Sequence, residues 1–154
     1  MSGNAITQET ITHLIQQALQ ARRHSYAPYS DFQVGAALLA ADGTVYTGVN
    51  VENASYPAGV CAEKTALSKA VSEGQRQFTA IAVAGGHRQE DSTALRDYCP
   101  PCGVCRQFLS EFCAASFTVI TARSVTDYRT YTLADLLPCS FEKRQLDRTS
   151  GAEV

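Results

Sequence analysis

The sequence predicts an α/β fold in which a mixed sheet of about five strands lies between two layers of helices, a three-layer α-β-α sandwich. Segments with helical periodicity alternate with short strand-like segments in the order α-β-β-α-β-α-β-β-α, and such interleaving is typical of a sheet covered by helices. Asp42-Gly43 separates two strand-like segments and predicts a hairpin, so one strand pair is antiparallel. Residues 79–84 are mostly apolar, as in a strand covered on both faces.

The first half of the chain contains a helix and the hairpin. Residues 7–22 form an amphipathic helix with Thr7 as its cap, and its apolar positions share one helical face: Ile11, Leu14, Ile15, Ala18 and Leu19. Turn-forming residues at 26–30 end this helix. Residues 32–39 and 44–49 are the two strands of the hairpin, and the Asp-Gly pair supplies the positive φ angles of its turn.

The second half supplies the remaining elements. A helix covers residues 61–73, and Gly74 lies where a C-terminal cap is expected. Gly85-Gly86 predicts a turn after the strand at 79–84. A third helix begins near Cys102 and directs Phe108, Leu109 and Phe112 inward; the last elements are strands at 117–122 and 128–131 and a short helix at 133–137 with Thr132 and Asp135 in a capping box. We expect one domain over residues 1–154, with a charged tail over about 142–154.

Composition narrows the class of protein. Of the 154 residues, 45% are hydrophobic and 18% are charged, values of a globular chain. The net charge of −2 lacks the basic surplus of nucleic-acid-binding domains, so no nucleic-acid partner is expected. No apolar run is long enough to cross a membrane, and the first residues lack the pattern of a signal peptide. We therefore expect a cytoplasmic protein whose six cysteines are reduced.

Two short segments carry the candidate chemistry. Cys61-Ala62-Glu63 opens one predicted helix, and Pro101-Cys102-Gly103-Val104-Cys105 opens another. Thiolates at helix N-termini are stabilised by the helix dipole, so two facing helix starts could hold three sulfurs around one Zn²⁺. Three protein ligands leave the fourth tetrahedral position open, which is typical of catalytic zinc. Glu63 lies beside the metal and can move a proton to or from water, which predicts hydrolytic chemistry.

These segments also match the signature of the zinc deaminases. From the turn at 26–30 to Phe141, the chain resembles the small, homotetrameric cytidine deaminases that hold zinc through three cysteines. The resemblance implies deamination of cytidine and deoxycytidine to uridine and deoxyuridine with release of ammonia, in pyrimidine salvage. It implies one Zn²⁺ per subunit on Cys61, Cys102 and Cys105. Zinc hydroxide would attack C4 of the pyrimidine, and Glu63 would pass protons first to N3 and then to the departing amine.

The same resemblance implies roles in substrate binding. Asn50 and Glu52 would hydrogen-bond the 3′-hydroxyl of the ribose. Phe32 would stack near the base, and the backbone of Ala62 would meet the pyrimidine edge.

The family's homotetramer completes its active sites across subunit interfaces. Tyr56 and Phe141 match positions that reach such shared sites, so the resemblance implies a homotetramer here. One departure from the family is Lys64, where typical members have arginine after the cysteine-alanine-glutamate triplet. Lysine keeps the charge but lacks the planar pair of donors that could reach the sulfurs.

Alternatives remain open from the sequence. Cys99 lies three residues before Cys102 and could be a fourth ligand, which would make a closed, structural zinc module and leave Glu63 without a role. Within deamination, the substrate could be another free nucleoside, a nucleoside antibiotic or a base within a nucleic acid. The short chain and its net charge of −2 argue against a polynucleotide substrate.

Overall fold

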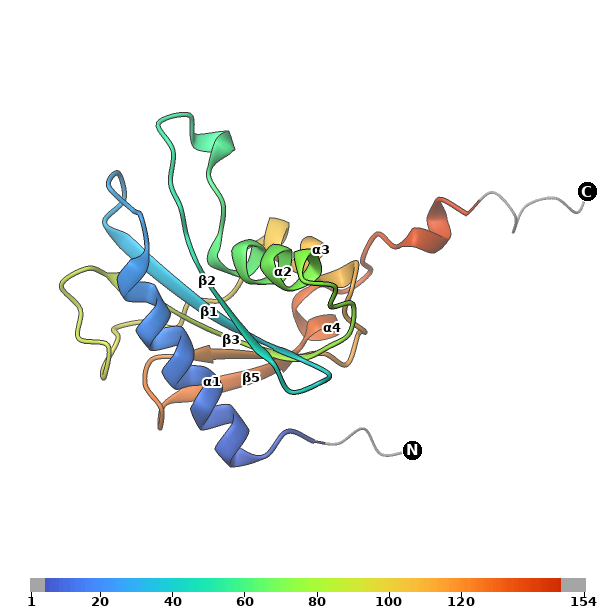
Figure 1. Ribbon diagram of the computed structural model, residues 1–154, viewed down its shortest axis with the longest axis horizontal. Helices are drawn as coiled ribbons and strands as arrows, with labels where there is room; N and C mark the ends of the chain where they lie inside the picture. The colour runs from blue at the N-terminus through green and yellow to red at the C-terminus, as the bar shows by residue number, and fades with distance from the viewer. Residues whose placement is uncertain (1–4, 148–154) are drawn as a thin grey trace, which may run out of the picture.

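A computed structural model describes residues 5–147, and its centre is one five-stranded sheet with the strand order β2-β1-β3-β4-β5 (Figure 1). The strands are β1 (Phe32–Ala40), β2 (Val45–Val49), β3 (Phe78–His87), β4 (Thr118–Ala122) and β5 (Tyr128–Thr132). The β3–β4 pair is parallel, whereas β1–β2, β1–β3 and β4–β5 are antiparallel. The mixed sheet predicted from the sequence is confirmed.

Helices cover both faces of this sheet. The helices are α1 (Gln8–Ala21), α2 (Ala62–Ser72), α3 (Gly103–Ser110) and α4 (Leu133–Leu136), with short 3-10 turns at Arg22–His24, Tyr56–Ala58 and Lys143–Gln145. One apolar core joins α1 to the sheet through residues such as Leu14 and Ala82. The other core joins α2, α3 and α4 to the opposite face through residues such as Leu67 and Val83. The three-layer arrangement is therefore confirmed as well.

The hairpin and β3 differ in detail from the expectation. In the hairpin loop Gly43 alone has a positive φ, because the turn from Ala40 to Gly43 ends on this one left-handed residue. The turn predicted at Gly85-Gly86 is wrong, because both glycines continue β3 in register with β1. A side chain at Gly85 would lie 2.7 Å from the Cys99 sulfur. These glycines therefore give space to the loop that folds over the strand.

Two other glycines allow the helices to approach the sheet closely. A Cβ at Gly35 would lie 2.1 Å from the carbonyl oxygen of Ala18 in α1. A Cβ at Gly48 would lie 2.4 Å from the carbonyl oxygen of Ala62 and 2.4 Å from the nitrogen of Ala66 in α2. Real Cβ atoms do not tolerate such distances, so the backbone of α2 rests directly on β2.

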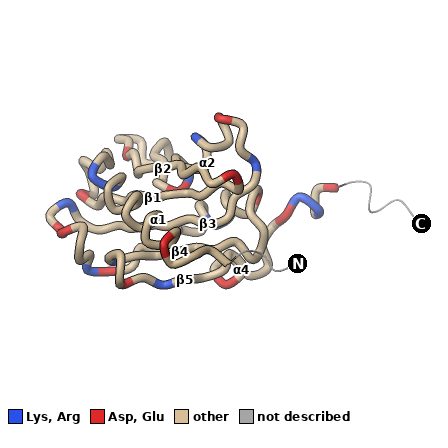
Figure 2. Tube along the Cα trace, turned by 60° about the horizontal axis from the view of Figure 1, so that its bottom comes forward, with Lys and Arg blue, Asp and Glu red and all other residues tan. Residues whose placement is uncertain are grey.

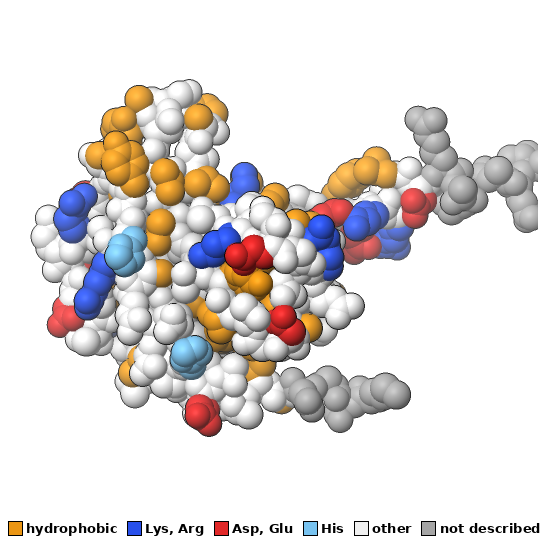
Figure 3. Space-filling view, in the orientation of Figure 1, with side chains coloured by type: hydrophobic (Ala, Val, Ile, Leu, Met, Phe, Trp, Pro, Cys, Tyr) orange, Lys and Arg blue, Asp and Glu red, His pale blue; other side chains and the backbone are white. Residues whose placement is uncertain are grey.

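The segment between β2 and α2 extends away from the body of the molecule (Figure 1). Hydrophobic side chains gather on it (Figure 3), and its large exposed ones are Val51 and Tyr56. Two more exposed tyrosines lie against it from the turn before β1: Tyr26 bridges to Val51, and the Tyr29 ring contacts the Tyr56 ring. Acidic and basic residues are interspersed along the chain (Figure 2). Within residues 5–147, no helix combines the length and the apolar character needed to cross a bilayer.

Candidate active site

Three cysteines meet where α2 and α3 begin. Cys61 is the N-cap of α2, Cys102 is the N-cap of α3, and Cys105 lies in the first turn of α3. Their sulfur atoms all lie within 4.8 Å of one another, and the Cys61 and Cys102 sulfurs are 3.9 Å apart. Three soft sulfur ligands at this spacing fit Zn²⁺. The grouping predicted from the two motifs is therefore present in the structure.

The electrostatics of the cluster favour a thiolate. A hydrogen bond with the Cys105 thiol is the main reason that the pKa of Cys61 falls to about 6. The same hydrogen bond raises the pKa of Cys105. The positive charge of Lys64 also lowers the pKa of Cys61. The Nζ atom of Lys64 lies over the Phe108 ring, 5.4 Å from the ring centroid.

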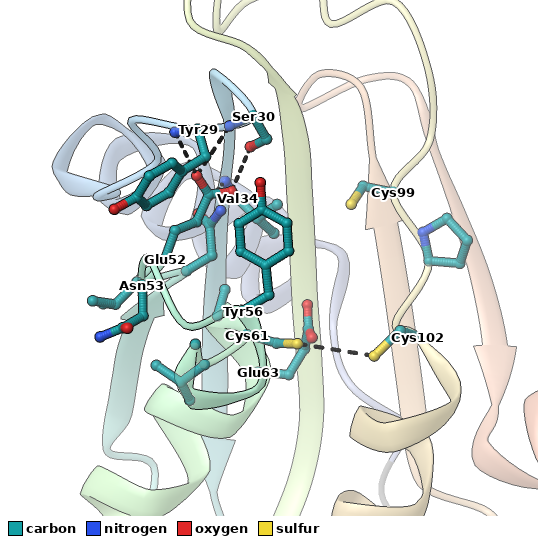
Figure 4. A pocket seen from close by; sticks show the side chains of 16 residues that line it. Tyr29, Ser30, Val34, Glu52, Asn53, Tyr56, Cys61, Glu63, Cys99 and Cys102 are labelled. Carbon is teal, nitrogen blue, oxygen red and sulfur yellow. Dashed lines mark hydrogen bonds between the residues drawn. The ribbon is translucent and has the colours of Figure 1, made fainter.

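Glu63 lies beside the sulfurs and is almost completely buried. The first turn of α2 directs its carboxyl group toward the Cys61–Cys102 pair, and 5% of the residue remains exposed (Figure 4). Burial raises the pKa of Glu63 above its ordinary value, and a hydrogen bond from the Cys105 thiol partly opposes this. A raised pKa brings a carboxyl group closer to neutral pH, where it can both accept and donate a proton.

A cavity of about 540 Å³ opens above this cluster. Its floor includes Cys61, Glu63 and Cys102, and one wall carries Asn50 and Glu52; further lining residues are Tyr29, Ser30, Val34, Tyr56, Ala62, Cys99 and Pro100. This volume lies within the range of small-molecule sites.

Asn50 is held in place by the start of β1. Its Oδ1 accepts hydrogen bonds from the Val34 backbone N–H, at 2.8 Å, and from the Ser25 hydroxyl. Its Nδ2 donates to the Phe32 carbonyl oxygen at 2.9 Å. An amide nitrogen carries two hydrogens. The second hydrogen on Nδ2 is the donor that Asn50 can offer to a ligand.

Glu52 is held by the turn before β1. Its Oε1 accepts the Tyr29 and Ser30 backbone N–H groups at 3.0 and 3.1 Å, and its Oε2 accepts the Ser30 hydroxyl (Figure 4). These hydrogen bonds, that of the Ser30 side chain first, lower the pKa of Glu52. The group is therefore an ionised acceptor on the wall of the cavity, suited to a hydroxyl group of a ligand.

Comparison with known proteins decides the family. Residues 8–121 match the family model described as the cytidine and deoxycytidylate deaminase zinc-binding region. The chain belongs to this deaminase family. A cytidine deaminase of Halalkalibacterium halodurans is 46% identical over 87% of this chain and 96% of its own length. The crystal structure of a cytidine deaminase from Burkholderia pseudomallei is 42% identical, with a TM-score of 0.76, over 88% of this chain and 100% of that one.

A probable cytidine deaminase of Dictyostelium discoideum is 39% identical over 92% of this chain and 90% of its own length. The similarity thus covers nearly the whole of these relatives. It supports the deaminase fold and the zinc-binding region together.

The deaminase cavity brings most of the predicted substrate-binding residues together. Asn50, Glu52, Tyr56 and Ala62 line it. Phe32 lies next to it instead, with its ring edge-on to His87 at a centroid distance of 5.3 Å, and Val34 on the same strand lines the cavity. Sequence analysis missed Val34, although the alternation of a strand places residues two apart on one face.

Phe141 lies away from the cavity in the described chain. The residue is 58% exposed, and its carbonyl oxygen accepts a hydrogen bond from Gln107 Nε2 at 2.9 Å. Within a single chain, therefore, Phe141 does not complete the site.

Cys99 shares the cavity but not the metal cluster. Among the described residues, the group of sulfurs suited to a metal consists of Cys61, Cys102 and Cys105. The Cys99 side chain packs over Gly85, and burial raises the pKa of this thiol to about 12. This arrangement disfavours the closed, structural zinc module that the sequence left open.

Proposed function

We propose that the protein is a zinc-dependent hydrolase that converts cytidine and deoxycytidine to uridine and deoxyuridine with release of ammonia. One observation carries the proposal: the buried Glu63 carboxyl group lies on the floor of a cavity beside Cys61 and Cys102, which form a three-thiol cluster with the buried Cys105. Hydrolysis needs an activated water and a group that carries protons, and this floor can supply both.

The residues divide this work between them. Cys61, Cys102 and Cys105 would hold Zn²⁺, which acts as a Lewis acid and makes water a nucleophile at neutral pH. Glu63 would take one proton from the attacking water and deliver it to N3 of the pyrimidine, and would then take the remaining proton of the same water oxygen and pass it to the amine that leaves C4. Asn50 and Glu52 would bind the 3′-hydroxyl of the sugar, Phe32 would lie near the base, and the backbone of Ala62 would meet its edge.

Removal of the metal tests this proposal directly. We expect the cytidine absorbance band to decay with stoichiometric ammonia release, to stop decaying after chelator treatment, and to decay again when Zn²⁺ is added. The reason is that the thiol cluster alone lacks the Lewis acid that activates water. Turnover that persists in demonstrably zinc-free protein would contradict the proposal. So would a zinc-loaded protein that turns over neither cytidine nor deoxycytidine.

A free nucleoside suits the site better than a base within a polynucleotide. Glu52 presents an ionised carboxylate on the wall where the sugar would lie, and a carboxylate repels phosphate. Acidic and basic residues are interspersed along the chain, and the net charge is −2 (Figure 2). Polynucleotide channels instead carry a basic groove with stacking aromatic residues.

The assembly we propose is a homotetramer with shared active sites. Tyr56 is 76% exposed on the extended segment above the cavity, and Phe141 is 58% exposed. Exposed aromatic side chains are enriched at protein interfaces. The neighbouring subunits would cover these side chains and complete each site with them.

Light scattering tests the assembly. We expect a particle of four times the chain mass of 16.6 kDa. Replacing Tyr56 by aspartate is expected to dissociate it and to lower activity, because the charge would be buried at the interface. A monomer with full activity would contradict the shared sites.

The proposal also covers the domain organisation of the chain and the place where the enzyme works. The whole chain would be one deaminase domain with a charged tail over about 142–154, of which residues 148–154 lie outside the described part of the chain. The protein would work in the cytoplasm, in pyrimidine salvage.

A further inference from the structure

The carboxylate of Glu52 depends on a turn with an unusual backbone. Asp31 has a φ of 58°, in the left-handed region that residues other than glycine seldom occupy. This conformation brings the Phe32 N–H back to the Ser30 hydroxyl oxygen, at 3.0 Å. Because that oxygen accepts from Phe32, the hydroxyl hydrogen is directed to Glu52 Oε2. The backbone of Asp31 thus orients a donor to Glu52.

Arg88 holds Asp31 in this conformation from the end of β3. Its Nε lies 2.8 Å from Asp31 Oδ1, and its backbone N–H donates to the Asp31 carbonyl oxygen at 3.0 Å. A third bond, from the Asp31 N–H to the Ala27 carbonyl oxygen at 3.0 Å, closes the turn on its other side. The residue is therefore held through its side chain and through both of its backbone polar groups.

An exposed ion pair by itself contributes little to stability. The Arg88 and Asp31 side chains are 56% and 41% exposed, and such pairs have a small effect on folding. Their place matters more than their strength, because a left-handed aspartate costs energy that the surrounding contacts must offset. The Arg88–Asp31 pair holds a strained residue in the turn that binds Glu52, so it is suited to positioning the Glu52 carboxylate.

We propose that Asp31 and Arg88 are positioning residues that set the selectivity of the site for a sugar with a 3′-hydroxyl. They would do so through the turn that holds Glu52. This inference rests on the proposed function, because it takes Glu52 as the group that binds this hydroxyl. Neither side chain is required to touch the substrate.

The test compares cytidine with 3′-deoxycytidine, which lacks only that hydroxyl. We expect Arg88→Ala and Asp31→Ala to raise the KM for cytidine by about three- to fivefold, the scale of an exposed ion pair, and to leave kcat unchanged. The kcat/KM for 3′-deoxycytidine should stay the same. The preference for cytidine, taken as the ratio of the two kcat/KM values, would therefore fall by the same factor.

Further variants separate positioning from general damage. Asp31→Gly keeps the left-handed backbone without the ion pair, so the preference should fall less than in Asp31→Ala. In a Glu52→Gln background, Arg88→Ala should not change the preference further, because the group it positions is already altered. Glu111→Gln breaks an exposed ion pair with Lys143 away from the cavity and should leave both substrates unaffected.

Three outcomes are decisive. A selective loss for cytidine supports the inference. An equal loss for both substrates, or an unchanged preference, overturns it while leaving the proposed deaminase activity intact. Absence of cytidine turnover in the unchanged protein would overturn the proposed function, and this inference with it.

Discussion

Replacing Glu63 by glutamine is expected to lower kcat for cytidine by at least about 100-fold, a common scale for a group that transfers protons. Glutamine has almost the same shape but can neither accept the proton of water nor donate one to the departing amine. The three cysteines are untouched by the change, so the variant should still bind one Zn²⁺ per chain. Steady-state ammonia release and metal analysis of the same sample measure both quantities.

Glu73→Gln is the matched control for this change. Glu73 is an exposed glutamate at the other end of α2, at its C-cap, and its replacement should leave kcat unchanged. Normal turnover in Glu63→Gln would contradict the mechanism and favour a zinc that only stabilises the fold. Loss of zinc together with activity would instead indicate that Glu63 takes part in holding the metal.

Replacing Arg22 by methionine is expected to lower the free energy of unfolding by about 2–5 kcal/mol, because the buried carbonyl oxygens of Gln33 and Gly86 lose their donor. Arg22 is 1% exposed, just after α1. Its guanidinium donates to two carbonyl oxygens and one hydroxyl at 3.0 Å, and to two more carbonyl oxygens at 3.4 Å; the acceptors are Gly86, His87, Ser92, Gln33 and Glu90. Burial lowers the pKa of Arg22, and Glu90 raises it, but the guanidinium stays charged.

Urea denaturation measures this loss as a lower midpoint with an unchanged slope. Arg23→Met is the matched control, since the neighbouring arginine is exposed and its replacement should change stability by less than about 0.5 kcal/mol. An Arg22→Met protein as stable as the unchanged one would show that the acceptors find other donors.

The metal cluster was predictable because its determinants are local. Cys61 and Cys102 each precede a helix by one residue, and the spacing from Cys102 to Cys105 is one helical turn. A helix start fixes the direction of such side chains with little help from the rest of the fold. Thr7 and the Thr132–Asp135 box were predictable for the same reason, and both form as expected.

Contacts between distant segments were not predictable in this way. Gly85-Gly86 has the composition of a turn, but the loop that packs over it keeps both residues within β3. The partners of Arg22 lie 11 to 70 residues away along the chain. The place of Val34 in the cavity depends on which face of β1 the chain closes over. Local patterns do not contain this information.

The contact between Gly48 and α2 has a consequence for genetic experiments. Backbone atoms of Ala62 and Ala66 lie where a side chain at Gly48 would begin, so a larger residue must displace the helix that carries Cys61 and Glu63. A steric clash between two side chains can be relieved by a second mutation that makes the partner side chain smaller. A clash with backbone atoms cannot be relieved in this way, because no substitution removes those atoms. In a screen for second-site suppressors, Gly48→Ala should therefore yield true revertants and no compensating change in the core.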